Sequence, residues 1–140
     1  MKILFLVLVS TGLSWASDTF SADTFLDEKT GLMWQDNSDA KYIKKDWDGA
    51  MIFCTQLQLA GHDDWRLPSV KVLKQLVSAD PRDGGIKKGF KNLGGSGYYW
   101  SRDVHESSNE FAWMMNFKRG YEYSNYKTYE RHIRCVRDSP

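Results

Sequence analysis

The chain has 140 residues, of which 41% are hydrophobic and 14% aromatic, and its formal net charge is +1. This length suffices for one domain of ordinary size. The near balance of charge argues against a general nucleic-acid-binding protein, because such proteins gain affinity from many basic contacts with phosphate groups.

The first sixteen residues have the pattern of an export signal. Lys2 is followed by an apolar run over residues 3–9, and small residues stand at Ser14 and Ala16. The run is too short to span a bilayer, which takes roughly 20 apolar residues. We therefore predict a signal peptide over residues 1–16, no stable membrane anchor, and export to the periplasm or the cell exterior. Its removal leaves equal numbers of basic and acidic residues.

Residues 17–29 are expected to form an N-terminal extension or edge strand, since apolar and polar residues alternate over 20–25. After a polar turn, a short apolar strand is predicted over 32–35, followed by a loop over 36–45. Asp46 is then expected to begin a helix that runs to about Leu59, because its apolar residues recur at three- and four-residue steps.

A glycine and a proline separate this helix from the next one. Gly61 is expected to end the first helix. Pro68 favours an extended conformation at the residue before it, and Ser69 is a helix cap. A second helix is predicted from Ser69 to about Ala79. We interpret Trp65 and Arg66 as structural, with the indole in the core and the guanidinium bound to loop carbonyls or a carboxylate.

The second half of the chain has the pattern of strands. A long loop rich in glycine and lysine spans residues 82–97, and loops of this length are often functional. Strands are predicted over 98–104 and 111–117, the latter from a clear alternation, and a last strand over 132–137. A tyrosine-rich polar segment spans 121–129. Two helices followed by antiparallel strands indicate an α+β domain.

The two cysteines, Cys54 and Cys135, favour a disulfide in an exported protein. A bridge over this separation contributes about 4 to 5 kcal/mol in the loop-entropy model. The alternative, two free thiols or a redox pair, lacks the C-x-x-C spacing typical of redox sites.

Several motifs resemble, in order, a family named after the C-terminal domain of the Legionella collagen-like adhesin. They are Thr30-Gly31-Leu32-Met33-Trp34, Gly61-His62-Asp63-Asp64-Trp65-Arg66-Leu67-Pro68-Ser69, Tyr99-Trp100-Ser101, Ala112-Trp113 and Arg134-Cys135-Val136-Arg137. The resemblance spans residues 30–138, which we predict to be the domain. It implies a C-type-lectin-like fold in which two helices pack on an antiparallel sheet and a disulfide ties a helix to the final strand. Val72 departs from the family, where Glu often completes a capping box with the residue equivalent to Ser69.

Metal and catalytic sites are not predicted. Asp63 and Asp64 offer oxygen ligands for calcium, but acidic pairs beside glycine typically form turns, and the sugar-binding signatures of C-type lectins are absent. The histidines stand in separate segments without ligand spacing. Formylglycine-generating enzymes share the fold that the resemblance implies, but they need free cysteines. We expect no cofactor and no enzymatic activity.

Two groups of residues are candidates for ligand binding. The first is aromatic and polar, a mixture typical of antibody paratopes, although an ordinary edge hairpin has the same composition. Its members are Tyr98, Tyr99, Trp100, Tyr121, Tyr123, Asn125 and Tyr126. The second group is basic and suits polyanions, although a solvated face is the alternative. Its members are Lys87, Lys88 and Lys91, joined by Lys118 and Arg119.

These patterns favour a non-enzymatic module that binds a protein or a carbohydrate, with a polyanionic glycan among the candidates, outside the cytoplasm. One alternative is a subunit of a surface or secretion assembly. Another is an enzyme distantly related to the formylglycine-generating group. The partner is expected to be extracellular or periplasmic and not a nucleic acid; the oligomeric state is not predicted.

Overall fold

A computed structural model describes residues 23–80 and 85–139 of the protein. The predicted signal peptide, most of the predicted strand over 20–25 and the start of the glycine-rich loop lie outside the described residues. The elements, in chain order, are β1 (Thr24–Asp27), β2 (Leu32–Gln35), α1 (Ser38–Tyr42), β3 (Lys44–Lys45), α2 (Trp47–Gln56), α3 (Val70–Lys74), β4 (Tyr98–Val104), β5 (Phe111–Asn116), β6 (Tyr121–Tyr126), β7 (Arg131–His132) and β8 (Val136–Asp138).

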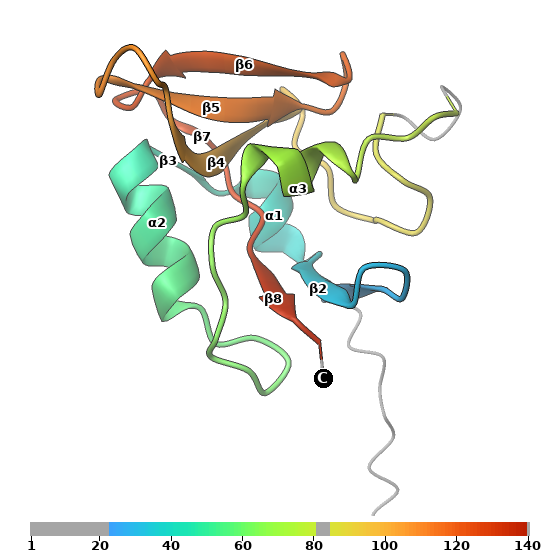
Figure 1. Ribbon diagram of the computed structural model, residues 1–140. Helices are drawn as coiled ribbons and strands as arrows, with labels where there is room; N and C mark the ends of the chain where they lie inside the picture. Colours follow the sequence, from blue (N-terminus) through green and yellow to red (C-terminus); the bar gives the residue numbers. More distant parts are fainter. Residues whose placement is uncertain (1–22, 81–84, 140) are drawn as a thin grey trace, which may run out of the picture.

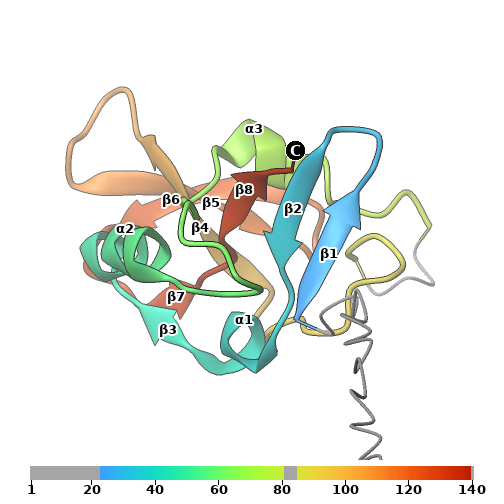
Figure 2. The same ribbon diagram turned by 90° about the horizontal axis from the view of Figure 1, so that it is seen from below.

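The strands form two sheets. The larger one has the order β3-β7-β4-β5-β6 and lies at the top of Figure 1, and the smaller has the order β1-β2-β8. Figure 2 shows the three strands of the smaller sheet side by side, with the C-terminus at the end of β8. All pairings are antiparallel except that of β4 with β7. The predicted α+β class is confirmed.

The core lies on both faces of the larger sheet, because successive side chains of a strand point to opposite sides. On one side Trp100 and Met114 pack with residues of α2. On the other side Tyr99 and Met115 pack with Leu73 of α3 and with residues of the smaller sheet. The disulfide between Cys54 of α2 and Cys135 is present as predicted.

The predicted loop over 36–45 is wrong, because it contains a short helix and a short strand. The side chain of Asn37 accepts a hydrogen bond from the backbone N–H of Ala40 at 3.2 Å and so caps α1. The helix has only five residues, too few to show a helical period in the sequence. The strand that follows it, β3, has two residues, and these pair with β7.

The single last strand predicted over 132–137 is also wrong. The chain leaves the larger sheet after β7 and enters the smaller one as β8, so this segment joins the two sheets. Both helix ends also come earlier than predicted. α2 stops at Gln56, and Gly61 is not its terminator. α3 stops at Lys74, while its predicted cap is present: the Ser69 hydroxyl accepts from the N–H of Val72 at 3.2 Å.

Candidate functional site

Three tyrosines from β4 and β6, the strands on either side of β5, lie together on the side of the larger sheet that α2 covers. Tyr98 of β4 and Tyr121 of β6 occupy positions paired through Asn116 of β5, and Tyr123 is two residues further along β6. The ring centroids of Tyr98 and Tyr123 are 5.6 Å apart, and those of Tyr121 and Tyr123 are 5.0 Å apart. Tyr98 and Tyr123 pack against the core at the margin of the region under α2, and Tyr121 is exposed.

Two arginines complete this group. The Arg131 guanidinium lies 5.2 Å from the centroid of Tyr98 and 5.3 Å from that of Tyr129. Arg119, in the turn between β5 and β6, interacts with Tyr121, Tyr123 and Tyr98, and these interactions raise its pKa. We call the six residues the tyrosine–arginine surface: Tyr98, Arg119, Tyr121, Tyr123, Tyr129 and Arg131. In the described part of the chain, neither guanidinium forms an ion pair with a carboxylate.

Three side chains of this surface, Arg119, Tyr121 and Tyr123, shift one another's pKa. Hydrogen bonds from Tyr123 and then from Arg119 hold the pKa of Tyr121 below its usual range. The hydrogen bond with Tyr121, followed by burial, raises the pKa of Tyr123. The hydrogen bond with Tyr121 also raises the pKa of Arg119, so this side chain stays cationic in neutral solution. The surface therefore presents positive charge between aromatic rings and hydroxyl groups, an arrangement suited to an anionic ligand.

Tyr99 and Trp100, predicted as ligand contacts, are wrong in that role, because both are fully buried. Tyr99 points to the α3 side of the sheet, where its hydroxyl donates to the carbonyl of Ala40 at 2.6 Å. Trp100 shares a side with Tyr98 but lies deeper, and its indole N–H donates to the carbonyl of Lys45 at 3.0 Å.

The remaining two residues of the aromatic and polar group lie at the far end of β6. Asn125 is half-buried, and its Oδ1 accepts from the N–H of Tyr126 at 2.8 Å. The exposed Tyr126 ring packs on Phe111 at 4.4 Å and approaches Tyr129 at 5.8 Å. Tyr126 therefore continues the tyrosine–arginine surface at its edge.

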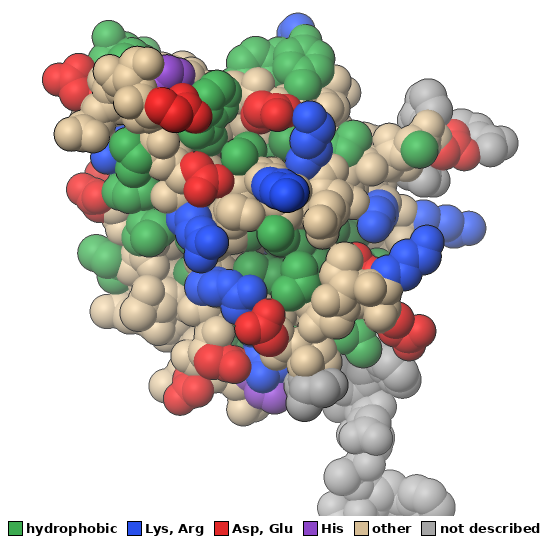
Figure 3. All heavy atoms as spheres, viewed as in Figure 1, with side chains coloured by type: hydrophobic (Ala, Val, Ile, Leu, Met, Phe, Trp, Pro, Cys, Tyr) green, Lys and Arg blue, Asp and Glu red, His purple; other side chains and the backbone are tan. Residues whose placement is uncertain are grey.

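The three lysines lie elsewhere, because their loop is fixed to the smaller sheet. Lys87 Nζ is 3.8 Å from the Asp27 carboxylate, and Phe90 stacks on Phe25 of β1 at 4.1 Å. Lys88 and Lys91 are exposed. Lys118 and Arg119, predicted to join this group, lie in the turn between β5 and β6, which shares a hollow with Gly85 of the same loop. Figure 3 shows Lys and Arg side chains spread over α3 and the loop, with acidic side chains between them.

Sequence analysis missed a buried ionic cluster that fixes this loop. Arg134 is fully buried, and its Nη1 lies 3.2 Å from Asp36 Oδ1 and donates to the carbonyl of Gln35 at 2.6 Å. Its Nη2 donates to the carbonyl of Asn92. The Asp36 carboxylate accepts from the backbone N–H groups of Lys91 (2.9 Å) and Asn92 (3.0 Å). No local pattern marks the pair, which is separated by 98 residues.

The four residues predicted as structural lie between the two sheets. Trp65 is 3% exposed, and its indole N–H donates to the carbonyl of His62 at 3.2 Å. Arg66 pairs with Asp138 at 3.1 Å, and its backbone exchanges two hydrogen bonds with Val136 of β8. Pro68 is buried and Ser69 caps α3.

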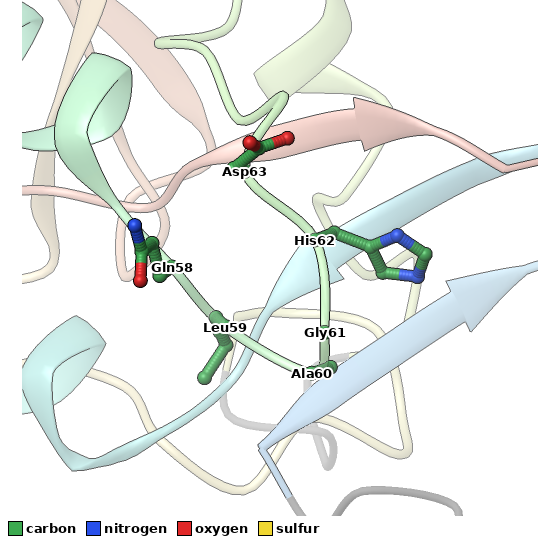
Figure 4. A pocket seen from close by; sticks show the side chains of 6 residues that line it. All are labelled: Gln58, Leu59, Ala60, Gly61, His62 and Asp63. Carbon is green, nitrogen blue, oxygen red and sulfur yellow. The ribbon is translucent and has the colours of Figure 1, made fainter.

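A hollow of about 500 Å³ opens beside the hairpin of residues 58–63. Leu59 and His62 exchange two backbone hydrogen bonds, and the turn between them places Ala60 and Gly61 at φ values of 54° and 77°. In Figure 4 the His62 ring points away from the side chains of Gln58 and Asp63. The hollow therefore brings no reactive groups together.

The neighbouring Asp64 is held by the end of the chain. Its carboxylate binds Arg137 through two contacts, at 2.6 and 3.2 Å. This hydrogen bonding holds the pKa of Asp64 below its usual value. No group of three or more His, Cys, Asp or Glu side chains among residues 23–80 and 85–139 could hold a metal ion. Within the same ranges, none of the helices is long and apolar enough to cross a membrane.

Comparison with known proteins agrees with the motifs in the sequence. No curated protein sequence matches the chain. The family model of the Lcl C-terminal domain matches residues 23–137, which is most of the chain and includes the tyrosine–arginine surface, the disulfide and the buried cluster. The chain belongs to the Lcl C-terminal domain family and is an adhesin-related module.

Proposed function

We propose that this protein is an exported, non-enzymatic binding module whose tyrosine–arginine surface recognises an anionic glycan. Membership of an adhesin-related family and the Cys54–Cys135 disulfide are consistent with a protein outside the cytoplasm. The observation that carries the proposal is the pair of guanidinium groups, Arg119 and Arg131, set among tyrosine rings and not neutralised by a carboxylate within the described chain.

The chemistry of the surface fits an acidic sugar for two reasons. The planar guanidinium fork matches sulfate and carboxylate groups with two parallel hydrogen bonds. Tyrosine offers a large, rigid contact area and a hydroxyl that bonds sugar hydroxyls, and it loses little conformational entropy on binding. Tyr98, Tyr121 and Tyr123 supply three such rings side by side.

The proposal of a non-enzymatic role rests on the placement of the reactive side chains. Both cysteines are joined in the disulfide, so neither is a free thiol. His62 lies in the hairpin beside the hollow, His105 stacks on Trp113, and His132 is buried. A nucleophile with an adjacent base, which most hydrolytic mechanisms need, is not assembled by these residues.

The lysine loop is the competing contact for the same class of ligand. Lys88 and Lys91 are exposed and Lys87 is partly engaged with Asp27, so the loop offers point charges without aromatic rings. A site made of these lysines would bind polyanions with little preference for sugar structure, because ammonium groups impose no planar geometry.

A glycan array that includes sulfated polysaccharides, read at two salt concentrations, tests the proposal. We expect binding that weakens at higher salt and falls about tenfold or more in the Arg119→Met/Arg131→Met variant. The Lys87→Ala/Lys88→Ala/Lys91→Ala variant is the matched control, and we expect a smaller loss. A blank array, or an arginine variant that binds like the wild type, overturns the proposal. A stable oligomer on size-exclusion chromatography together with a blank array favours the assembly subunit.

A further inference from the structure

His132 of β7 is buried beside Tyr99 and is not part of the tyrosine–arginine surface. It is 2% exposed, and its ring stacks on Tyr99 with centroids 5.3 Å apart. Gly94 covers the edge of the ring so closely that a Cβ atom there would overlap the imidazole. Neither ring nitrogen makes a hydrogen bond of ordinary geometry with a described residue, and a weaker interaction with the Ile43 backbone only partly offsets the effects that lower the pKa of the ring. The side chain is thus enclosed, and neither of its polar atoms has a strong hydrogen-bond partner.

The charged groups around this imidazole are cationic. Lys44 of β3 is its cross-strand partner, Arg131 precedes it, and Arg134 follows two residues later. From β4 it meets the Tyr99 ring, and the buried residue of α1 is uncharged Ala40. The carboxylate of this network, Asp36, is bound to Arg134. Burial, followed by the charges of Lys44 and Arg134, lowers the pKa of His132 to about 4.

The same place holds the anchors of the glycine-rich loop. The N–H of Gly94 donates to the Tyr99 hydroxyl at 2.8 Å, directly beside the imidazole. Asn92 and Lys91 are bound by Arg134 and Asp36. A protonated imidazole needs water or an acceptor at each N–H, and Gly94 lies directly against the edge of the ring that carries Nε2. The least costly way to hydrate His132 is therefore to lift this part of the loop.

We propose that His132 is an acid-sensitive latch for residues 85–97. Protonation of its ring opens the loop at residues 90–94 and frees Lys87, Lys88 and Lys91 from their fixed position, while β4, β5 and β6 stay folded. The latch itself does not depend on the proposed function. One consequence does rest on the proposed function: acid should change the contribution of the lysine loop to glycan binding.

The direction and size of the effect follow from linkage. Because the closed state lowers the pKa of His132 below its ordinary value, the latch is fully closed above about pH 6.5 and weakens as the pH falls toward about 4. If the open loop restores an ordinary pKa, the opening equilibrium increases about twentyfold between pH 7 and pH 5.

Hydrogen–deuterium exchange on the mature protein at pH 7 and pH 5 tests the latch without any ligand. Labelling times are scaled for the intrinsic exchange rate at each pH. We expect peptides from residues 85–97 to show an increase of about twentyfold in opening at pH 5, and peptides from β5 to show little change. Equal loosening of both regions overturns the proposal, since it indicates global unfolding.

Variants assign the effect to the imidazole. In His132→Gln and His132→Phe, which do not titrate, we expect the pH response of residues 85–97 to disappear. The matched control is His105→Gln, which removes a histidine that stacks on Trp113. This variant should keep the pH response of residues 85–97. A response that persists in either His132 variant overturns the latch. If neither variant folds, an NMR titration of wild-type His132 decides, because a pKa near 6.5 contradicts the latch and a value near 4 supports it.

Discussion

Two adjacent tyrosines of β4 each lie against an arginine at the same distance, and only one of the pairs faces solvent. Tyr98 is 5.2 Å from Arg131 on the α2 side of the sheet, and Tyr99 is 5.2 Å from Arg134 on the other side. Arg134 is fully buried and binds Gln35, Asp36 and Asn92. Arg131 donates to the carbonyl of its neighbour Glu130.

The comparison separates residues that hold the fold from residues available to a ligand. Both Nη atoms of the inner guanidinium donate to the protein, and only its buried Nε lacks a partner among the described residues. The outer guanidinium donates through Nη1 to one carbonyl and keeps further Nη donors for another molecule. Both pairs consist of a tyrosine ring and a guanidinium at the same distance, so neither the residue types nor the contact identifies a functional site. What differs is access to solvent and the number of partners that the protein supplies.

The largest difference between the two pairs should appear when the arginines are replaced. Arg134→Met leaves the Asp36 carboxylate buried without its cation, and we expect a loss of about 3 to 5 kcal/mol in the free energy of unfolding. Arg131→Met should cost less than about 1 kcal/mol, because its contacts lie near the surface. Urea denaturation measures both. Equal losses for the two variants would contradict the assignment of Arg134 to the fold and of Arg131 to ligand binding.

The buried region around His132 should also not tolerate one added methyl group at Gly94. Gly94→Ala forces a Cβ into the imidazole of His132, and we expect a loss of about 2 to 3 kcal/mol. Gly95→Ala is the matched control, since a Cβ there meets nothing within 4 Å. We expect the control to be neutral or slightly stabilising. Thermal unfolding of the two variants measures the difference, and a Gly94→Ala protein as stable as Gly95→Ala would show that the loop is not closed on His132.

A smaller contrast is expected when only the tyrosine hydroxyls are removed. Tyr99→Phe leaves the carbonyl of Ala40 and the N–H of Gly94 without their buried partner, which should cost about 1 to 2 kcal/mol. Tyr98→Phe should change the free energy of unfolding by less than about 0.5 kcal/mol, because its ring lies at the surface margin. Denaturation curves for both proteins suffice. A larger loss for Tyr98→Phe would reverse the assignment of the two faces.

The sequence predicted much of the fold because its local signals are strong. Alternation over β5, the caps at Asp46 and Ser69, and the presence of only two cysteines each have a direct physical cause that needs no knowledge of the rest of the chain. The family was also predictable, since its motifs recur in order along most of the chain.

The faces of β4 could not be predicted, because alternation does not show which side is covered. Both sides of this sheet carry core residues, so Tyr98 and Tyr99 look equivalent in the sequence. The Asp36–Arg134 pair was invisible for a different reason. Its partners are 98 residues apart and meet only because the segment after β7 crosses between the sheets, a step that no glycine or proline marks.

The smallest predicted effect concerns the coupling within the tyrosine–arginine surface. Hydrogen bonds from Tyr123 and Arg119 stabilise the ionised form of Tyr121, so removing either should raise the pKa of Tyr121 toward its ordinary value. Tyr123→Phe should have the larger effect and Arg119→Met the smaller, and Tyr126→Phe is a control outside the coupled group. NMR titration of the tyrosine ring carbons measures the shift residue by residue. If the pKa of Tyr121 is the same in all three variants as in the wild type, β6 and the turn before it do not hold these side chains together, and the surface is not preorganised for a ligand.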